Sequence, residues 1–396
     1  MNTIHTAWVE VDLNAIRHNY RAVREFASVP VMAVLKTNAY GHGLELAAGA
    51  LKGEADWFGV STLEEGIRVR AVDPDTPTLV FHPVGAWNAA GIVERGLTAS
   101  VDSEAGALAL AEAGRAAGVT PAAHLKIDAG MARFGVDPGD EETISRIVSA
   151  PGIRWDGMYT HLATSAEKKP GLKGDLCRTQ FLVMARLVST MATDPSAVAS
   201  VANAPSWLGP LAEAGPRWIH AFNSAGILRF REDIRHYSLV RCGTLLYGQY
   251  PSAYVPKALD LRPTWSYKAR IVSIRRIRAG ATVGYGAEWR ARRESSIATI
   301  PVGYYDGFTV EPLSVWARRG GLKGLAKRLM GKDRLTVKTA LGPAPVVGRV
   351  AAQSAMLDVT DLPGIQVGDV VEMPARRVLV GEHIPRVAQT CERVDI

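Results

Sequence analysis

Short apolar segments alternate with helix-like segments through the first 250 residues, and this alternation limits the possible folds more than any other feature. The intervening segments carry apolar residues at helical spacing. Alternation with short connections favours a parallel sheet with helical crossovers, and the number of units favours closure into an (α/β)8 barrel. The strands are predicted at 8–11, 31–35, 57–61, 78–82, 98–102, 123–128, 155–161, 198–204 and 217–221.

The pattern changes after about residue 251. The stretch LDLRPTWSYKARIVSIRRIRAG alternates apolar and polar residues, as half-buried antiparallel strands do, and Gly-Pro turns recur beyond it. A chain of 396 residues is also longer than one hydrophobic core usually serves. We therefore predict two domains, a barrel over 1–250 and a mostly antiparallel β domain over 251–396.

A basic segment, 313–334, interrupts the second domain and places leucines at helical spacing. Such a segment can bind a membrane surface or nucleic acid. The simpler interpretation, which we adopt, is a solvated basic insertion that packs its Leu and Trp side chains on its own domain. We therefore expect neither a nucleic acid nor a membrane partner.

The bulk composition excludes several other classes of protein. The net charge of +7 suits anionic ligands, including a phosphate-bearing cofactor. Three cysteines without a C-x-x-C pattern predict neither a disulfide scaffold nor a zinc site, and we expect no metal. The N-terminal residues show no signal-peptide pattern, and no apolar run approaches the length of a membrane span. A reduced, cytoplasmic location is expected.

Lys36 stands at the exit of a buried strand, where α/β barrels display catalytic side chains. Its segment, VLKTNAYGHG, places Tyr40 four residues further on. These residues leave two interpretations open: a Schiff base between Lys36 and a carbonyl cofactor, or a surface lysine at a strand end. Other polar residues predicted at the same barrel mouth are Lys126, Asp128, His161, Asn203, His220 and Arg241.

Two later segments have the composition of phosphate-binding loops. HAFNSAG offers the Ser224 hydroxyl and backbone N–H groups before a short helix, and VRCGTLLYG offers Arg241 and a tight turn at Gly243 and Thr244. Each signal alone is weak. Together with Lys36, Tyr40 and His161 at the barrel mouth, these segments provide what pyridoxal phosphate (PLP) needs. PLP needs an amine for its aldehyde and donors for its phosphate.

The ordered motifs of the chain resemble the alanine racemase family. VEVDLNAIRHNY, VLKTNAYGHG, KIDAGMARFG, YTHLAT, HAFNSAG and VRCGTLLYG are similar to its barrel motifs, and LRPTWSYKARI, VGYGAEW and PVGYYDG to those of its C-terminal domain. The resemblance spans nearly the whole chain. It implies a PLP-dependent amino-acid racemase of fold type III that works as a homodimer.

The resemblance also implies roles for single residues. Lys36 would carry PLP and act as one catalytic base, and Tyr285 would act on the opposite face from the neighbouring subunit. Arg133 would contact the PLP phenolic oxygen and the substrate carboxylate. The remaining cofactor-binding residues would be Tyr40, Ser224, Gly243 and Thr244 at the phosphate, His161 against the ring and Arg241 at the pyridine nitrogen. Lys126 matches a lysine that is carbamylated in some members.

Some positions depart from the family pattern. VGRVAAQS places Ala351, Ala352 and Gln353 where Cys-Met-Asp is usual, although the Ala352 N–H can still bind the substrate carboxylate. The C-terminus lacks the family's phosphate-supporting tyrosine, and Thr390 is the nearest hydroxyl. These departures, with the basic insertion, lead us to expect an atypical C-terminal domain and a reshaped substrate pocket.

Three functions remain open at this point. The first is racemisation of L- and D-alanine, which supplies D-alanine for the cell wall. The second is a related PLP enzyme with a different or broader amino-acid substrate in specialised metabolism. The third is a non-catalytic PLP-binding protein, which the presence of Tyr285 and of a second domain disfavours.

Overall fold

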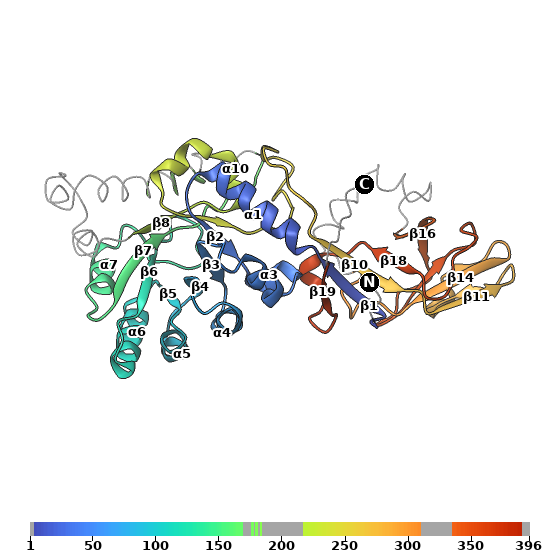
Figure 1. The fold of residues 1–396 in the computed structure, drawn as a ribbon, viewed down its shortest axis with the longest axis horizontal. Coiled ribbons are helices and arrows are strands. Elements are labelled where there is room, and N and C mark those ends of the chain that lie inside the picture. The colour runs from blue at the N-terminus through green and yellow to red at the C-terminus, as the bar shows by residue number, and fades with distance from the viewer. Residues whose placement is uncertain are drawn as a thin grey trace. The chain divides into compact units, whose positions relative to one another are not determined.

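The computed structural model forms two compact units (Figure 1). One comprises Leu13–Tyr40 and Leu44–Pro263, and the other comprises Met1–Asp12, Gly41–Gly43 and Thr264–Ile396. The structure describes residues 4–168, 176–177, 179–180, 183, 217–309 and 335–389. The predicted strand 198–204, the basic insertion and Thr390 lie wholly outside these ranges.

Within the described residues, the first unit contains a sheet of eight parallel strands in the order β8-β7-β6-β5-β4-β3-β2-β9. β9, the last of these strands along the chain, pairs with β2, the first. In addition, the Arg241 N–H of β9 donates to the carbonyl of Phe222, just after β8, at 2.9 Å. The predicted parallel barrel is therefore confirmed. Its strands are β2 (Val31–Val34), β3 (Trp57–Val60), β4 (Thr78–Pro83), β5 (Thr98–Val101), β6 (Ala122–Lys126), β7 (Arg154–Tyr159), β8 (Trp218–His220) and β9 (Val240–Cys242).

Helices connect these strands. In α1 the buried residues Ile16, Tyr20 and Val23 recur at helical spacing, which turns one face of the helix toward the core. Thr62 caps α4, since its hydroxyl accepts from the Glu65 N–H. The described helices are α1 (Leu13–Ala27), α3 (Leu44–Leu51), α4 (Leu63–Val72), α5 (Ala89–Glu94), α6 (Glu104–Ala117), α7 (Glu141–Val148) and α10 (Ser224–Arg229), followed by the 3-10 helix η2 (Arg231–His236). The segment labelled α2 (Lys36–Gly41) has left-handed backbone angles from Thr37 to Tyr40.

One predicted barrel strand belongs to the other sheet instead. The strand at 8–11 forms as β1 (Ala7–Val11), but it pairs antiparallel with β10 (Trp265–Arg270) and parallel with β19 (Arg386–Ala388). The barrel closes without it because β2 pairs with β9. Among the described residues, β7 pairs with β8, with Tyr159 opposite His220.

The second unit is built on a sheet in the order β11-β14-β17-β16-β15-β18-β10-β1-β19. Its strand pairs are antiparallel apart from that of β1 with β19, which confirms the predicted mostly antiparallel domain. A separate hairpin of β12 (Thr282–Val283) and β13 (Trp289–Arg290) carries the 3-10 helix η3 (Tyr285–Ala287). The other strands are β11 (Ser273–Ile277), β14 (Ser295–Ile300), β15 (Thr336–Thr339), β16 (Gly342–Val347), β17 (Ala355–Asp358) and β18 (Val370–Met373), and η4 (Arg377–Leu379) precedes β19.

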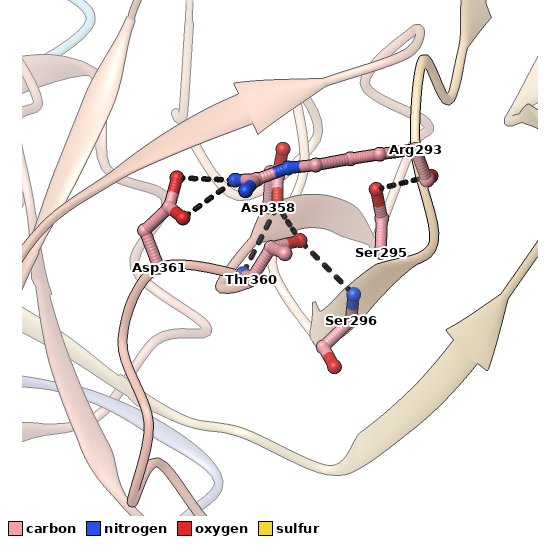
Figure 2. A network of polar contacts seen from close by, with 6 residues as sticks. All are labelled: Arg293, Ser295, Ser296, Asp358, Thr360 and Asp361. Carbon is pink, nitrogen blue, oxygen red and sulfur yellow. Dashed lines mark hydrogen bonds and ion pairs between the residues drawn. The ribbon is translucent and has the colours of Figure 1, made fainter. Parts of the chain in front are cut away.

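A polar network fastens the turn after β17 to the start of β14 (Figure 2). The Asp358 carboxylate accepts from the Thr360 N–H, and the Thr360 hydroxyl accepts from the Ser296 N–H, each at 3.0 Å. Arg293 reaches both carboxylate oxygens of Asp361 at 2.5 and 2.6 Å. Both partners of that ion pair are largely exposed, so we assign the network to local structure.

The described residues contain no helix that is both long enough and apolar enough to cross a membrane.

Candidate active site

A cavity of about 450 Å³ lies at the carboxyl ends of the barrel strands. Side chains that follow different strands meet there, because parallel strands all end at one mouth of a barrel. The predicted site residues that line it are Lys36, Tyr40, Lys126, Arg133, His161, Ser224, Arg241, Gly243 and Thr244. Asp128 and His220, which were predicted at the same mouth, do not line this cavity in the part of the chain that the structure describes.

Two predicted site residues belong to the other unit. Tyr285 follows Gly284, whose φ is +75°, and the Tyr285 residue is 72% exposed. The Ala352 carbonyl accepts from the Tyr305 N–H at 3.0 Å. The roles of both residues in the chemistry stay predictions.

Lys36 opens a left-handed turn. Thr37, Asn38, Ala39 and Tyr40 all have φ between +52° and +57°. This conformation costs a residue with a side chain about 1–2 kcal/mol, so four in succession persist only where other contacts compensate. The Ala39 N–H donates to the Leu35 carbonyl at 2.7 Å, and the Asn38 carboxamide oxygen accepts from the Leu44 N–H at 2.8 Å. The turn places Tyr40 beside the cavity that Lys36 enters.

Tyr40, Gly243, Ser224 and Thr244 form one wall. A Cβ atom on Gly243 would lie 2.5 Å from the Tyr40 hydroxyl oxygen, so only glycine permits this approach. The Gly243 N–H donates to the Ser224 hydroxyl at 3.0 Å. The Thr244 hydroxyl is buried and has no hydrogen-bond partner within the described residues. A buried unpartnered hydroxyl is costly, which indicates that a bound group completes this wall.

Replacing Gly243 with alanine is expected to weaken PLP binding about 10- to 100-fold, because the new Cβ would displace the Tyr40 hydroxyl and so remove its predicted hydrogen bond to a charged phosphate. Titration of the apoprotein with PLP, followed by absorbance, measures the change. Gly49→Ala on α3 is the matched control, since its Cβ would meet only Val72 Cγ1 at 3.6 Å. Unchanged affinity in the Gly243 variant would remove this wall from the phosphate site.

Arg241 is buried, and its hydrogen bonds determine how its neighbours are protonated. It donates to the carbonyls of Thr160 and Ala221 at 2.8 and 3.0 Å and lies 2.6 Å from His220 Nδ1. An arginine can only donate, so His220 Nδ1 accepts and its Nε2–H donates to His124 Nδ1 at 3.0 Å. The proton of His124 is then on Nε2, which has no partner among the described atoms.

The histidines around Arg241 are neutral near pH 7. Burial lowers the pKa of His124 to about 3 and, together with the Arg241 charge, lowers the pKa of His161 and of His220 well below the ordinary value. Burial also lowers the pKa of Arg241, but only to about 10, so the guanidinium stays cationic. The site therefore presents one fixed buried cation among neutral imidazoles.

Burial and neighbouring cations also act on the two lysines of the cavity. The pKa of Lys36 is lowered by burial and by Arg133, and the Glu65 carboxylate opposes that change. Burial, followed by the charge of Arg241, lowers the pKa of Lys126 to about 7. The Lys126 amine donates to the Ile127 carbonyl at 2.7 Å. A larger fraction of each amine is therefore unprotonated near neutrality than in a free lysine.

The donors present fit PLP. Lys36 supplies an amine whose lowered pKa favours attack on an aldehyde. The wall of Tyr40, Ser224 and Thr244 supplies hydroxyl groups, including the unpartnered one, that suit a phosphate. Arg241 lines the cavity as a fixed cation that would donate to a ring nitrogen, and carbon-rich side chains complete the lining.

Sequence reasoning missed several residues at this site. Ser61 directly follows β3 and lines the cavity, so its place at a strand end was the available signal. Phe81, Phe134 and Tyr159 line it too, but an aromatic residue in or beside a strand does not by itself distinguish core from site. Glu65 lies outside the lining, and only the folded structure shows its contact with the Lys36 turn.

Comparison with known proteins agrees with these features. Residues 11–251 match the alanine racemase N-terminal domain family, and residues 264–394 match the alanine racemase C-terminal domain family. Alanine racemase 1 of Caldanaerobacter subterraneus subsp. tengcongensis is 33% identical over 368 residues, which span 92% of this chain and 84% of that protein.

Solved structures give the same result. Alanine racemase of Clostridium difficile 630 superposes with a TM-score of 0.80 at 25% identity, covering 98% of this chain and 97% of that one. The enzyme from D-cycloserine producing Streptomyces lavendulae gives 0.77 at 26% identity and 98% coverage of both chains. Nothing in these comparisons marks the C-terminal domain as atypical. The chain belongs to the alanine racemase family.

Proposed function

We propose that this protein is a PLP-dependent racemase that interconverts L- and D-alanine, with Lys36 and the partner subunit's Tyr285 as its two bases. The observation that carries the proposal is the meeting of Lys36, Arg241 and the wall around Thr244 at one cavity. The family is PLP-dependent and typically homodimeric, and its members are isomerases. Several relatives at about 30% identity carry the name alanine racemase, which supports alanine as the substrate.

Bound PLP would withdraw electrons from the amino acid and so acidify its Cα–H bond. Arg241 limits how far this withdrawal goes. Its guanidinium only donates, so it hydrogen-bonds a ring nitrogen without giving that nitrogen a full proton. Its bonds to two carbonyls and to His220 hold it in place. A short-lived carbanion suits racemisation, because a long-lived one favours transamination.

Racemisation needs a proton removed from one face of Cα and another delivered to the opposite face. Lys36 serves one face, and its lowered pKa lets the amine accept a proton nearer neutrality than a free lysine would. Tyr285 serves the other face in this proposal. Its exposure in the single chain fits a residue that completes a site on a second copy, which makes the homodimer the active form.

The remaining residues bind and orient. The hydroxyls of Tyr40, Ser224 and Thr244 hold the phosphate, and His161 lies against the ring. Arg133 binds the phenolic oxygen of PLP and the substrate carboxylate, which the Ala352 N–H also contacts. Each of these roles is part of the proposal.

A second candidate is a racemase with a different or broader amino-acid substrate. The small side chains of Ala351 and Ala352 favour it, because they leave more room beside a substrate than larger side chains would.

One experiment separates the two candidates. The protein, loaded with PLP, is incubated with a panel of L-amino acids in deuterated water, and loss of the Hα signal is followed by NMR. We expect alanine to lose its signal at least about 10-fold faster than larger amino acids, as one extra methylene in a pocket commonly changes rates by that factor. Faster loss from another amino acid would replace alanine as the substrate, and no loss from any would refute the racemase proposal.

A further inference from the structure

The Glu65 carboxylate joins the loops that follow two neighbouring barrel strands. One of its oxygens accepts from the Thr37 N–H at 2.6 Å, and the other accepts from the Ser61 N–H at 2.7 Å. Thr37 is the first left-handed residue after Lys36, and Ser61 follows β3 and lines the cavity. One side chain therefore fixes the backbone next to Lys36 relative to the adjacent strand end.

Helix capping alone does not explain this carboxylate. The sequence Thr62-Leu63-Glu64-Glu65 has the form of a capping box, and the Thr62 hydroxyl does accept from the Glu65 N–H at 3.3 Å. In a capping box the glutamate side chain returns to the N–H of the capping residue itself. Here both oxygens accept from other residues, Ser61 and Thr37, and the latter lies 28 positions away in the chain.

The same helix holds the next residue of the turn. Arg68, three positions after Glu65 on α4, donates to the Asn38 carboxamide oxygen at 3.1 Å and forms an ion pair with Glu45 at 2.6 Å. Asn38 in turn accepts from the Leu44 N–H. One face of α4 thus holds the first two residues of a segment whose φ angles are intrinsically unfavourable.

The Glu65 charge also acts directly on Lys36. It favours the ammonium form and so opposes burial and Arg133, which lower the Lys36 pKa. Removing the charge should therefore let the amine lose its proton at a lower pH. The Glu65 carboxylate therefore affects both the position and the protonation of the Lys36 amine.

We propose that Glu65 is a positioning residue for Lys36. The Glu65 carboxylate holds the left-handed turn, so that the Lys36 amine enters the cavity in one orientation. The inference rests on the role proposed for Lys36. It assigns Glu65 no contact with the cofactor or the substrate.

Glu65→Gln is the test variant. Glutamine has the same size but a single acceptor oxygen, so it keeps one of the two hydrogen bonds and turns an NH2 group toward the other backbone N–H. Glu64→Gln is the matched control, because it removes the same charge from the neighbouring, exposed position of α4. Glu65→Asp keeps the charge on a shorter side chain that does not reach both N–H groups.

Three readouts apply to these variants. In the apoprotein, hydrogen exchange at Thr37 or Ser61 should be at least about 10-fold faster in Glu65→Gln, because one hydrogen bond is lost. The midpoint of the pH dependence of PLP association should move to lower pH.

In the loaded enzyme, kcat for alanine should fall about 10- to 100-fold while KM changes little, as expected for a misplaced reacting group. Glu64→Gln should match the wild type in all three, and Glu65→Asp should combine faster exchange with a nearly unchanged midpoint.

Wild-type exchange and an unchanged midpoint in Glu65→Gln would overturn the inference, and so would equal effects in Glu64→Gln. If Glu65→Gln does not fold, Glu65→Asp serves as the test variant. Wild-type hydrogen exchange at Thr37 and Ser61 in Glu65→Asp would then reject the positioning role of Glu65. A wild-type protein that does not racemise alanine would refute the proposed function only. Exchange and PLP association in the apoprotein would still decide the role of Glu65.

Discussion

Replacement of Lys36 by alanine is expected to abolish racemisation, with a loss of at least about 10⁴-fold in kcat/KM. Under the proposed function, the variant would lose both the amine that binds the cofactor aldehyde and the base on one face of the substrate. Its left-handed turn should remain, because the hydrogen bonds of the Ala39 N–H and of the Asn38 carboxamide oxygen do not involve the Lys36 side chain. The absorption band of lysine-bound PLP and the rate of Hα exchange in deuterated water measure the two losses separately.

Lys52→Ala provides the control for this experiment. Lys52 is an exposed lysine just after α3, and its amine donates to the Val72 carbonyl at 3.1 Å, away from the cavity. That variant should keep the absorption band and full activity. Addition of a small primary amine should restore part of the activity of Lys36→Ala, since the cavity of about 450 Å³ admits such a molecule. Undiminished exchange in Lys36→Ala without added amine would exclude Lys36 as a base.

Tyr285→Phe is expected to slow the exchange of one alanine enantiomer about 10²- to 10⁴-fold more than that of the other. The variant keeps the aromatic ring and loses only the hydroxyl that would exchange a proton on the face opposite Lys36. Exchange of each enantiomer is followed separately by NMR in deuterated water. Equal, modest losses for both enantiomers would contradict the two-base assignment.

Mixing the Lys36→Ala and Tyr285→Phe variants, both impaired in racemisation, tests whether Tyr285 acts across a dimer. In a dimer of one Lys36→Ala chain and one Tyr285→Phe chain, one site combines both intact residues and the other has neither. Random exchange of subunits should therefore restore about one quarter of the wild-type activity. No recovery in a mixture shown to contain mixed dimers would mean that Tyr285 acts within its own chain or not at all.

The barrel and the β-rich domain were predictable because their signals are local. A buried parallel strand such as β2 reads as a continuous apolar run, and the strands of the second domain alternate in polarity. The end of each barrel strand then points to candidate residues, as it did for Lys36 and Arg241. The order of motifs along the chain was sufficient to identify the family.

Which of the two sheets β1 joins was not predictable in the same way. Ala7–Val11 has the composition of a barrel strand, and its place is decided by pairing with β10, more than 250 positions away. Nothing local distinguishes a strand that pairs with one distant segment from a strand that pairs with another. The assignment of Asp128 and His220 to the cavity failed for a related reason, since a strand end fixes a neighbourhood but not the direction of a side chain.

The amino-acid sequence determined that Lys36 ends a buried strand of an α/β barrel, because the pattern of apolar residues and the order of the segments can be read directly along the chain. Only the tertiary structure decided how its amine is presented. Four successive left-handed residues are intrinsically disfavoured and no local pattern predicts them. They persist because contacts made on folding, including those of Asn38 and Glu65, compensate for a conformation that the isolated segment would not adopt.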